Sequence, residues 1–95
     1  MRVKTPYKPR GEMYGLVKEM VGGSRVNVFC EDGKSRVGRI IGKMKKKVWI
    51  RPNDLVIIVP WTVQTDQKCD VIYRYIMTEK ERLKKINAIP KEMII

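Results

Sequence analysis

A dense block of cations in the middle of the chain is the feature best suited to chemistry. Residues 33–53 contain eight basic side chains and no acidic one: Lys34, Arg36, Arg39, Lys43, Lys45, Lys46, Lys47 and Arg51. A surface that only has to stay hydrated normally mixes both signs of charge. We therefore interpret the block as a phosphate-binding segment in which Gly42 lets the backbone approach an anion closely. A hydrated loop without a partner is the alternative.

The composition of the whole chain points to the same class of partner. Its 95 residues include 21 Lys and Arg against 10 Asp and Glu, which gives a formal net charge of +11. Such an excess favours a polyanion, either a nucleic acid or an anionic membrane surface. The longest apolar run, residues 55–61, contains Pro60 and is too short to cross a bilayer. A nucleic acid is therefore the expected partner, and membrane binding is not expected.

Catalysis and metal binding are not expected either. The chain has no histidine and its carboxylates are dispersed, so it lacks a neutral-pH acid or base and a metal-binding cluster. Cys30 and Cys69 are predicted to be two buried thiols, with a disulfide as the alternative. We expect no enzymatic activity, no metal and no cofactor. No apolar stretch follows the basic N-terminus, so no secretory signal is predicted and a cytoplasmic location is expected.

The order of polar and apolar residues predicts a small β-barrel behind a basic arm. Residues 1–11 carry Arg2, Lys4, Lys8 and Arg10 with almost no apolar content, so we expect them to be mobile. The hydrophobic alternation that follows predicts strands over residues 12–21, 25–30, 34–41, 48–50 with 54–61, and 69–76. Asp32 and Gly33 suit a hairpin turn, because both tolerate positive φ angles.

A helix is predicted to follow the last strand. Thr78 and Glu81 have the spacing of a capping box, Leu83 and Ile86 form a narrow apolar stripe, and Asn87 and Pro90 are expected to end the helix. The predicted parts are the arm (1–11), barrel (12–77), helix (78–89) and tail (90–95). The predicted fold is mainly β, a five-stranded OB-fold barrel with the C-terminal helix packed on it. An SH3-like barrel would produce nearly the same pattern.

One face of the second predicted strand is suited to nucleic-acid binding. Arg25, Asn27 and Phe29 share an outward parity there, and an OB-fold would place them beside Arg39. An aromatic ring among cations is what base stacking requires. A register shifted by one residue would instead make Phe29 a core residue. Trp49 is also a candidate RNA contact, although closing the core of a small domain is the favoured interpretation for both Trp49 and Trp61.

Four runs of the sequence together resemble the translation initiation factor 1A family, which is related to bacterial initiation factor one. They are Phe29-Cys30-Glu31-Asp32-Gly33, the segment 40–50 with Gly42-Lys43-Met44-Lys45-Lys46-Lys47-Val48-Trp49, the alternating Asp54-x-Val56-x-Ile58, and Cys69-Asp70-Val71-Ile72. The resemblance covers about residues 12–90. A C-terminal helix without a long acidic tail resembles the archaeal members.

The resemblance implies a non-catalytic OB-fold protein that binds small-subunit ribosomal RNA at the aminoacyl-tRNA (decoding) site. It implies that Lys43, Lys45, Lys46 and Lys47 form a loop that grips ribosomal RNA, and that Asn27 and Arg39 lie on RNA-facing strands. The basic arm would reach toward the decoding centre. The initiator tRNA complex and the initiation GTPase are expected in the same assembly.

Two further expectations concern the tail and the alternatives. Met93, Ile94 and Ile95 are hypothesised to be an exposed apolar hook for the initiation GTPase, against the alternative of an inert terminus. A general single-stranded RNA-binding protein or RNA chaperone of the cold-shock type is the second functional hypothesis. A structural ribosomal protein is the third. The pattern shows no broad apolar patch, so a monomer is expected.

Overall fold

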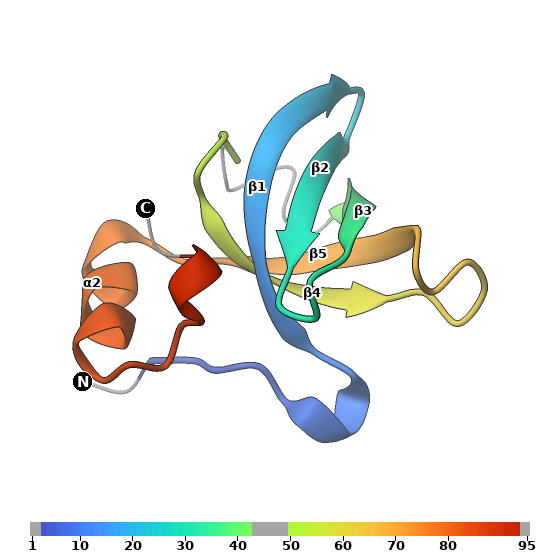
Figure 1. Cartoon of the computed structure of the whole chain (residues 1–95). Coiled ribbons are helices and arrows are strands. Elements are labelled where there is room, and N and C mark those ends of the chain that lie inside the picture. Colours follow the sequence, from blue (N-terminus) through green and yellow to red (C-terminus); the bar gives the residue numbers. More distant parts are fainter. Residues whose placement is uncertain (1–2, 43–49, 94–95) are drawn as a thin grey trace.

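A closed five-stranded barrel forms the centre of the molecule, as the computed structural model shows (Figure 1). The structure describes residues 3–42 and 50–93. The strands are β1 (Met13–Gly22), β2 (Arg25–Cys30), β3 (Ser35–Ile40), β4 (Leu55–Pro60) and β5 (Lys68–Arg74). The helix α2 (Met77–Lys85) follows, and two short 3₁₀ helices are η1 (Lys8–Arg10) and η2 (Lys91–Met93).

The strand order identifies the type of barrel. The strands pair in the order β1-β2-β3-β5-β4, and β4 closes the barrel by pairing with β1. The β3–β5 pair is parallel, while the β1–β2, β1–β4, β2–β3 and β4–β5 pairs are antiparallel. This is the arrangement of an OB-fold, a five-stranded Greek-key barrel. The predicted fold class, mainly β with a C-terminal helix, is confirmed.

The barrel interior is filled by alternate side chains of the strands. On β2 the inward residues are Val26, Val28 and Cys30, as the alternation predicts. Cys30 and Cys69 are free and buried, in agreement with the expected pair of thiols. Gly15 is required by close packing, because a Cβ atom there would lie 2.5 Å from a methyl carbon of Val28.

A second apolar cluster lies outside the barrel, where α2 and the chain after it cover β1, β4 and β5. Its buried members are Tyr14, Leu16, Leu55, Ile57, Tyr75, Leu83, Ile89 and Met93. Leu83 is the buried residue of α2, whereas Ile86 is 62% exposed, so the predicted apolar stripe holds for Leu83 alone. Asn87 adopts a left-handed φ of 56°, consistent with its predicted role in ending the helix.

The predicted capping box is wrong. The helix begins at Met77, one residue before Thr78, so the third helical position is Glu79 rather than Glu81. The backbone N–H of Ile76 donates to Oε1 of Glu79 at 3.0 Å, and the hydroxyl of Tyr73 donates to Oε2 at 2.8 Å. The tyrosine on β5 thus holds the capping carboxylate, a tertiary contact that the local spacing does not reveal.

The described part of the N-terminal arm is bound to the barrel instead of being free of it. The Tyr75 hydroxyl donates to the carbonyl of Lys4, and the Lys4 ammonium lies 5.3 Å from the centre of the Tyr73 ring. The backbone N–H of Tyr7 donates to Glu12 at 2.9 Å. The expectation of mobility counted only the arm's own apolar content, whereas its partners are side chains of the barrel.

The tail differs from its prediction for a similar reason. Met93 is 1% exposed and belongs to the second apolar cluster, so it is unavailable as an exposed hook. The described tail therefore stabilises the packing of α2 on the barrel. Ile94 and Ile95 lie outside the described residues.

Candidate nucleic-acid interface

Basic side chains of β2 and β3 lie next to each other on the outside of the barrel. Arg25 on β2 is the register partner of Arg39 on β3, and Arg39 is the partner of Asp70 on β5. The prediction that Arg25 shares a face with Arg39 is therefore confirmed. Like charges directly opposite each other are unfavourable unless an anion lies near them. Asp70 supplies one such anion, on the side of Arg39 away from Arg25.

Arg39, Trp61 and Asp70 form a connected cluster on this face. The Arg39 guanidinium donates to Oδ1 of Asp70 at 3.1 Å and lies 5.2 Å from the centre of the Trp61 ring. The indole Nε1 of Trp61 donates to the same Oδ1 at 2.9 Å. The Arg39 side chain is nevertheless 58% exposed. The cluster therefore holds a cation and an aromatic ring in fixed positions at the surface.

The loop between β4 and β5 is fixed by its own hydrogen bonds. The Thr65 hydroxyl donates to the carbonyl of Trp61 at 2.7 Å, and the N–H groups of Gln67 and Lys68 both donate to the carbonyl of Gln64 at 2.9 Å. The N–H of Trp61 donates to the carbonyl of Lys68 at 3.1 Å. The backbone beside the indole is thus held at both ends of the loop, which projects from the barrel away from α2 (Figure 1).

Three adjoining hollows run across this surface. The first has a volume of about 400 Å³ and is lined by Arg39, Val59, Pro60, Trp61, Thr62, Val63 and Asp70. The second is lined by Gly22, Gly23, Ser24, Arg25 and Arg39, and the third by Arg25, Val37, Arg39, Trp61 and Lys68. All three include Arg39, so they join there. We name the surface formed by Arg25, Val37, Arg39, Trp61, Lys68 and Asp70 the Arg39 face.

The position of the Arg39 face within the fold is informative. OB-fold proteins bind oligonucleotides on the face of strands 2 and 3 and on the loops joining strands 1–2 and 4–5. Arg25 and Arg39 lie on those strands, Gly23 lies in the first loop and Trp61 begins the second. Pro60-Trp61 at the start of that loop, followed by Lys68, was the sequence signal that could have identified Trp61 as a surface residue. Trp61 belongs to neither buried cluster.

Arg36 was predicted to contact RNA, but the structure removes it from the candidates. Its side chain is 2% exposed and makes two hydrogen bonds to Asp32, at 3.0 and 2.8 Å. Its Nε also donates to the carbonyl of Thr65 at 2.6 Å. The hydrogen bonds between Arg36 and Asp32 raise the pKa of Arg36 and lower the pKa of Asp32. Arg36 therefore ties the β2–β3 turn to the β4–β5 loop.

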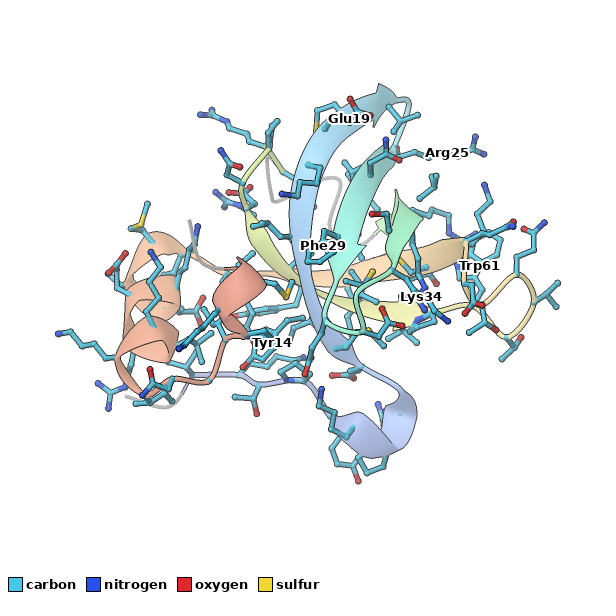
Figure 2. All side chains as sticks on the ribbon, viewed as in Figure 1. Tyr14, Glu19, Arg25, Phe29, Lys34 and Trp61 are labelled. Carbon is cyan, nitrogen blue, oxygen red and sulfur yellow. The ribbon has the colours of Figure 1, made fainter. Side chains whose placement is uncertain are left out.

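Two other candidates, Lys34 and Asn27, lie on the side of the barrel that carries the Arg39 face. Lys34 forms an ion pair with Asp66 at 2.7 Å, at the same end as the Arg36 contacts. Figure 2 shows Lys34, Arg25 and Trp61 along one side of the barrel, with Tyr14 toward α2. The carboxamide of Asn27 donates to Glu19 at 2.6 Å beside that face. The structure thus brings these residues together on one side.

Phe29 and two described basic residues of the arm, Lys8 and Arg10, have contacts other than the Arg39 face. Phe29 points outward, as predicted, but it packs against the second apolar cluster with the Lys18 ammonium 5.8 Å from its ring centre. Lys8 forms an ion pair with Glu31 at 2.8 Å. Arg10 lies 5.8 Å from the Tyr7 ring.

The remaining candidates fall at or beyond the limits of the described residues. Arg51 is exposed, and its backbone N–H donates to Asp54 at 2.9 Å. Arg2, Lys43, Lys45, Lys46, Lys47 and Trp49 lie outside the described residues. Within residues 3–42 and 50–93, no group of three or more acidic or cysteine side chains could hold a metal ion. None of the helices in that part of the chain has the length and apolar content needed to span a bilayer.

Comparison with known proteins agrees with the fold and with the resemblance of the sequence. The family model described as Translation initiation factor 1A / IF-1 matches residues 2–95. A translation initiation factor 1A of Methanococcus aeolicus is 55% identical over 74 residues, covering 78% of this chain and 70% of the relative. A translation initiation factor 1A of Methanococcus maripaludis is 51% identical over 84 residues, covering 88% of this chain and 81% of the relative.

A third relative extends the similarity over almost the whole chain. The translation initiation factor 1A of Picrophilus torridus is 52% identical over 91 residues, which covers 96% of this chain and 83% of the relative. The family match includes the basic segment 43–47 as well as the barrel and the helix. The predicted resemblance is confirmed, and the chain belongs to the translation initiation factor 1A family.

Proposed function

We propose that this translation initiation factor is non-catalytic and binds small-subunit ribosomal RNA at the aminoacyl-tRNA site, where it promotes initiator tRNA placement and subunit joining. The observation that carries the proposal is the Arg39 face, which combines exposed cations with an aromatic ring on the oligonucleotide-binding side of an OB-fold. Membership of the initiation factor family supports the ribosome as the source of the RNA.

The mechanism that we propose is occupancy of the site. Arg25, Arg39 and Lys68 neutralise phosphates and displace their counterions, so affinity falls steeply as salt rises. Lys45, Lys46 and Lys47 provide a second set of phosphate contacts. No covalent bond is made or broken, and the initiator tRNA complex and the initiation GTPase act in the same cytoplasmic assembly. The factor itself works as a monomer.

The test is co-sedimentation with isolated small ribosomal subunits over a series of salt concentrations. We expect tight binding at low salt, a linear fall of log affinity with log salt, and displacement by a ligand of the aminoacyl-tRNA site. Binding that the ligand does not displace would favour the general RNA-binding alternative. Retention through high-salt washing would favour a structural ribosomal protein.

The basic segment is tested in the same assay. Charge reversal of Lys45 and Lys46 to Glu should abolish binding to the subunit while the fold is retained, as circular dichroism and thermal unfolding would report. Reversal of Arg82 and Lys85, two exposed cations of α2, is the matched control, because it changes the net charge by the same amount on the side of the barrel opposite the β4–β5 loop (Figure 1). Unchanged binding of the Lys45/Lys46 variant would exclude the segment as a docking surface.

A further inference from the structure

We propose that the hollow beside Trp61 is a subsite for one unpaired nucleotide, with the base stacked on the indole and a phosphate held by Arg25, Arg39 and Lys68. The inference rests on the proposed function, since it assigns a defined part of the RNA to a defined part of the Arg39 face. Two adjoining hollows of different chemistry carry it.

The larger hollow has the lining that a base requires. It has a volume of about 400 Å³, and Val59, Pro60, Val63 and the Trp61 indole supply its apolar surface. Val63 is 72% exposed and Trp61 is only partly buried, so both apolar side chains are accessible to a ligand. Aromatic rings on OB-folds bind successive bases by stacking, because every base has a π-face. An apolar, ring-lined hollow at this loop fits a base better than it fits a phosphate.

The smaller hollow has the lining that a phosphate requires. Its volume is about 100 Å³, and three of its five lining residues are the cations Arg25, Arg39 and Lys68. Arg25 and Arg39 are register partners on neighbouring strands, so an anion between them would relieve their repulsion. Trp61 and Arg39 line both hollows. A base in one and a phosphate in the other therefore belong to the same nucleotide or to adjacent ones.

The cluster is organised before any ligand arrives. Oδ1 of Asp70 accepts from the Trp61 indole at 2.9 Å and from Arg39 at 3.1 Å, which fixes both side chains. Because the indole N–H is already bonded, recognition of the base depends on stacking rather than on hydrogen bonds to its edge. The subsite should thus accept any unpaired base and reject paired ones, whose faces are covered by their neighbours.

Fluorescence of Trp61 provides the direct test. The chain has two tryptophans, so Trp49→Phe leaves Trp61 as the single emitter, and all comparisons are made in that background. The probes are a short single-stranded oligoadenylate, an abasic sugar-phosphate strand of equal length, and a duplex of the same sequence, each titrated at low salt. Quenching of Trp61 by the oligoadenylate alone is expected.

Substitution of Trp61 measures how much the indole contributes to oligonucleotide affinity. Trp61→Leu should weaken oligoadenylate binding roughly 5- to 150-fold, the range for loss of one stacked base. The same substitution should leave binding of the abasic strand unchanged, and Trp61→Phe should retain most of the affinity. Thermal unfolding shows whether each variant folds, and if the Leu variant does not fold, the quenching titrations with the three probes still test the subsite. Equal loss on both strands, or binding without quenching, would overturn the subsite.

Failure of the subsite can be distinguished from failure of the proposed function. If Trp61→Leu binds small subunits as tightly as its background and both are displaced by a ligand of the aminoacyl-tRNA site, the subsite is wrong and the proposed function stands. If the oligoadenylate quenches Trp61 but the ligand never displaces the factor from subunits, the site on the ribosome is wrong and the nucleotide subsite stands.

Discussion

Arg36 and Arg39 lie three residues apart on β3 but point to opposite sides of the barrel wall. The Arg36 side chain is 2% exposed and paired with Asp32, whereas the Arg39 side chain is 58% exposed beside Trp61. Side chains alternate between the two faces of a strand, so residues separated by an odd number of positions point to opposite faces. Two identical residues of one basic block therefore have different surroundings: Arg36 holds two loops together, and Arg39 is exposed on the Arg39 face.

Arg36→Ala should destabilise the fold. It removes two hydrogen bonds to Asp32 and one to the carbonyl of Thr65, so the exposed Lys34–Asp66 ion pair is left to join the β2–β3 turn to the β4–β5 loop. Loss of one partner of a buried ion pair typically costs 3–5 kcal/mol; because Asp32 is partly exposed, we expect about 2–4 kcal/mol. Urea unfolding measures the change. Arg39→Ala is the control, with an expected loss below about 1 kcal/mol, and equal losses for the two variants would contradict the assignment.

Acid should remove the contribution of the Asp32 carboxylate. Hydrogen bonds from Arg36 hold the pKa of Asp32 below its usual value of 3.8 in the folded protein. A carboxylate with a depressed folded pKa stabilises the protein above its unfolded pKa and loses that effect as the pH falls through the folded pKa. The stability difference between the parent and Asp32→Asn should therefore be full at pH 5–6 and shrink below about pH 4. Unfolding free energies of both proteins are measured over this pH range. A difference that stays constant with pH would show that the Asp32 carboxylate does not stabilise the fold through its charge.

Gly15→Ala should strain the barrel interior. The added Cβ would lie 2.5 Å from Cγ1 of Val28 and 3.1 Å from Cγ2 of Ile58, both of which are fully buried. Overpacking of this kind typically costs about 1–3 kcal/mol. Gly42→Ala is the matched control, because nothing lies within 4 Å of its added Cβ. Thermal unfolding should separate the two variants; no difference between them would argue against the close packing at Gly15.

Met93→Ala should destabilise the packing of α2 rather than remove a partner contact. Met93 is 1% exposed in the second apolar cluster, so its truncation should cost about 2–4 kcal/mol. Ile86→Ala removes an apolar side chain that is 62% exposed and should change stability by less than about 0.5 kcal/mol. Guanidinium unfolding compares the two. A stable Met93→Ala variant would revive the exposed-hook hypothesis.

The strands and turns of the barrel could be predicted from the sequence, because alternation and turn residues depend only on residues that are close together in the chain. The alternation over residues 25–30 set the inward face of β2, and Asp32-Gly33 set the turn to β3. The same alternation applied to β3 would have marked Arg36 as inward, together with Gly38 and Ile40. Arg36 was wrongly predicted to contact RNA, because the basic residues of the block were counted without asking which face of the strand each one occupies.

Contacts between distant segments are what the sequence patterns missed. The Tyr75 hydroxyl binds the carbonyl of Lys4, 71 residues away, and Met93 packs in the same cluster as Tyr14. Neither partner can be inferred from the arm or the tail alone. The surface position of Trp61 likewise depends on its hydrogen bond to Asp70 on the adjacent strand. The composition of the arm or the tail does not show whether that segment is held in place, because this depends on the distant residues that it contacts.

The proposed function requires that the Arg39 face contacts ribosomal RNA when the factor binds the small subunit. Co-sedimentation of Arg39→Glu and Lys85→Glu with small subunits, over one salt series, measures this contact. Both substitutions change the net charge by the same amount, but Lys85 lies on α2, which is on the opposite side of the barrel from the β4–β5 loop (Figure 1). We predict that Arg39→Glu weakens binding on the order of tenfold or more and reduces the salt dependence, while Lys85→Glu behaves like the parent protein. Equal effects of the two substitutions, or unchanged binding of Arg39→Glu, would show that the Arg39 face does not contact the RNA.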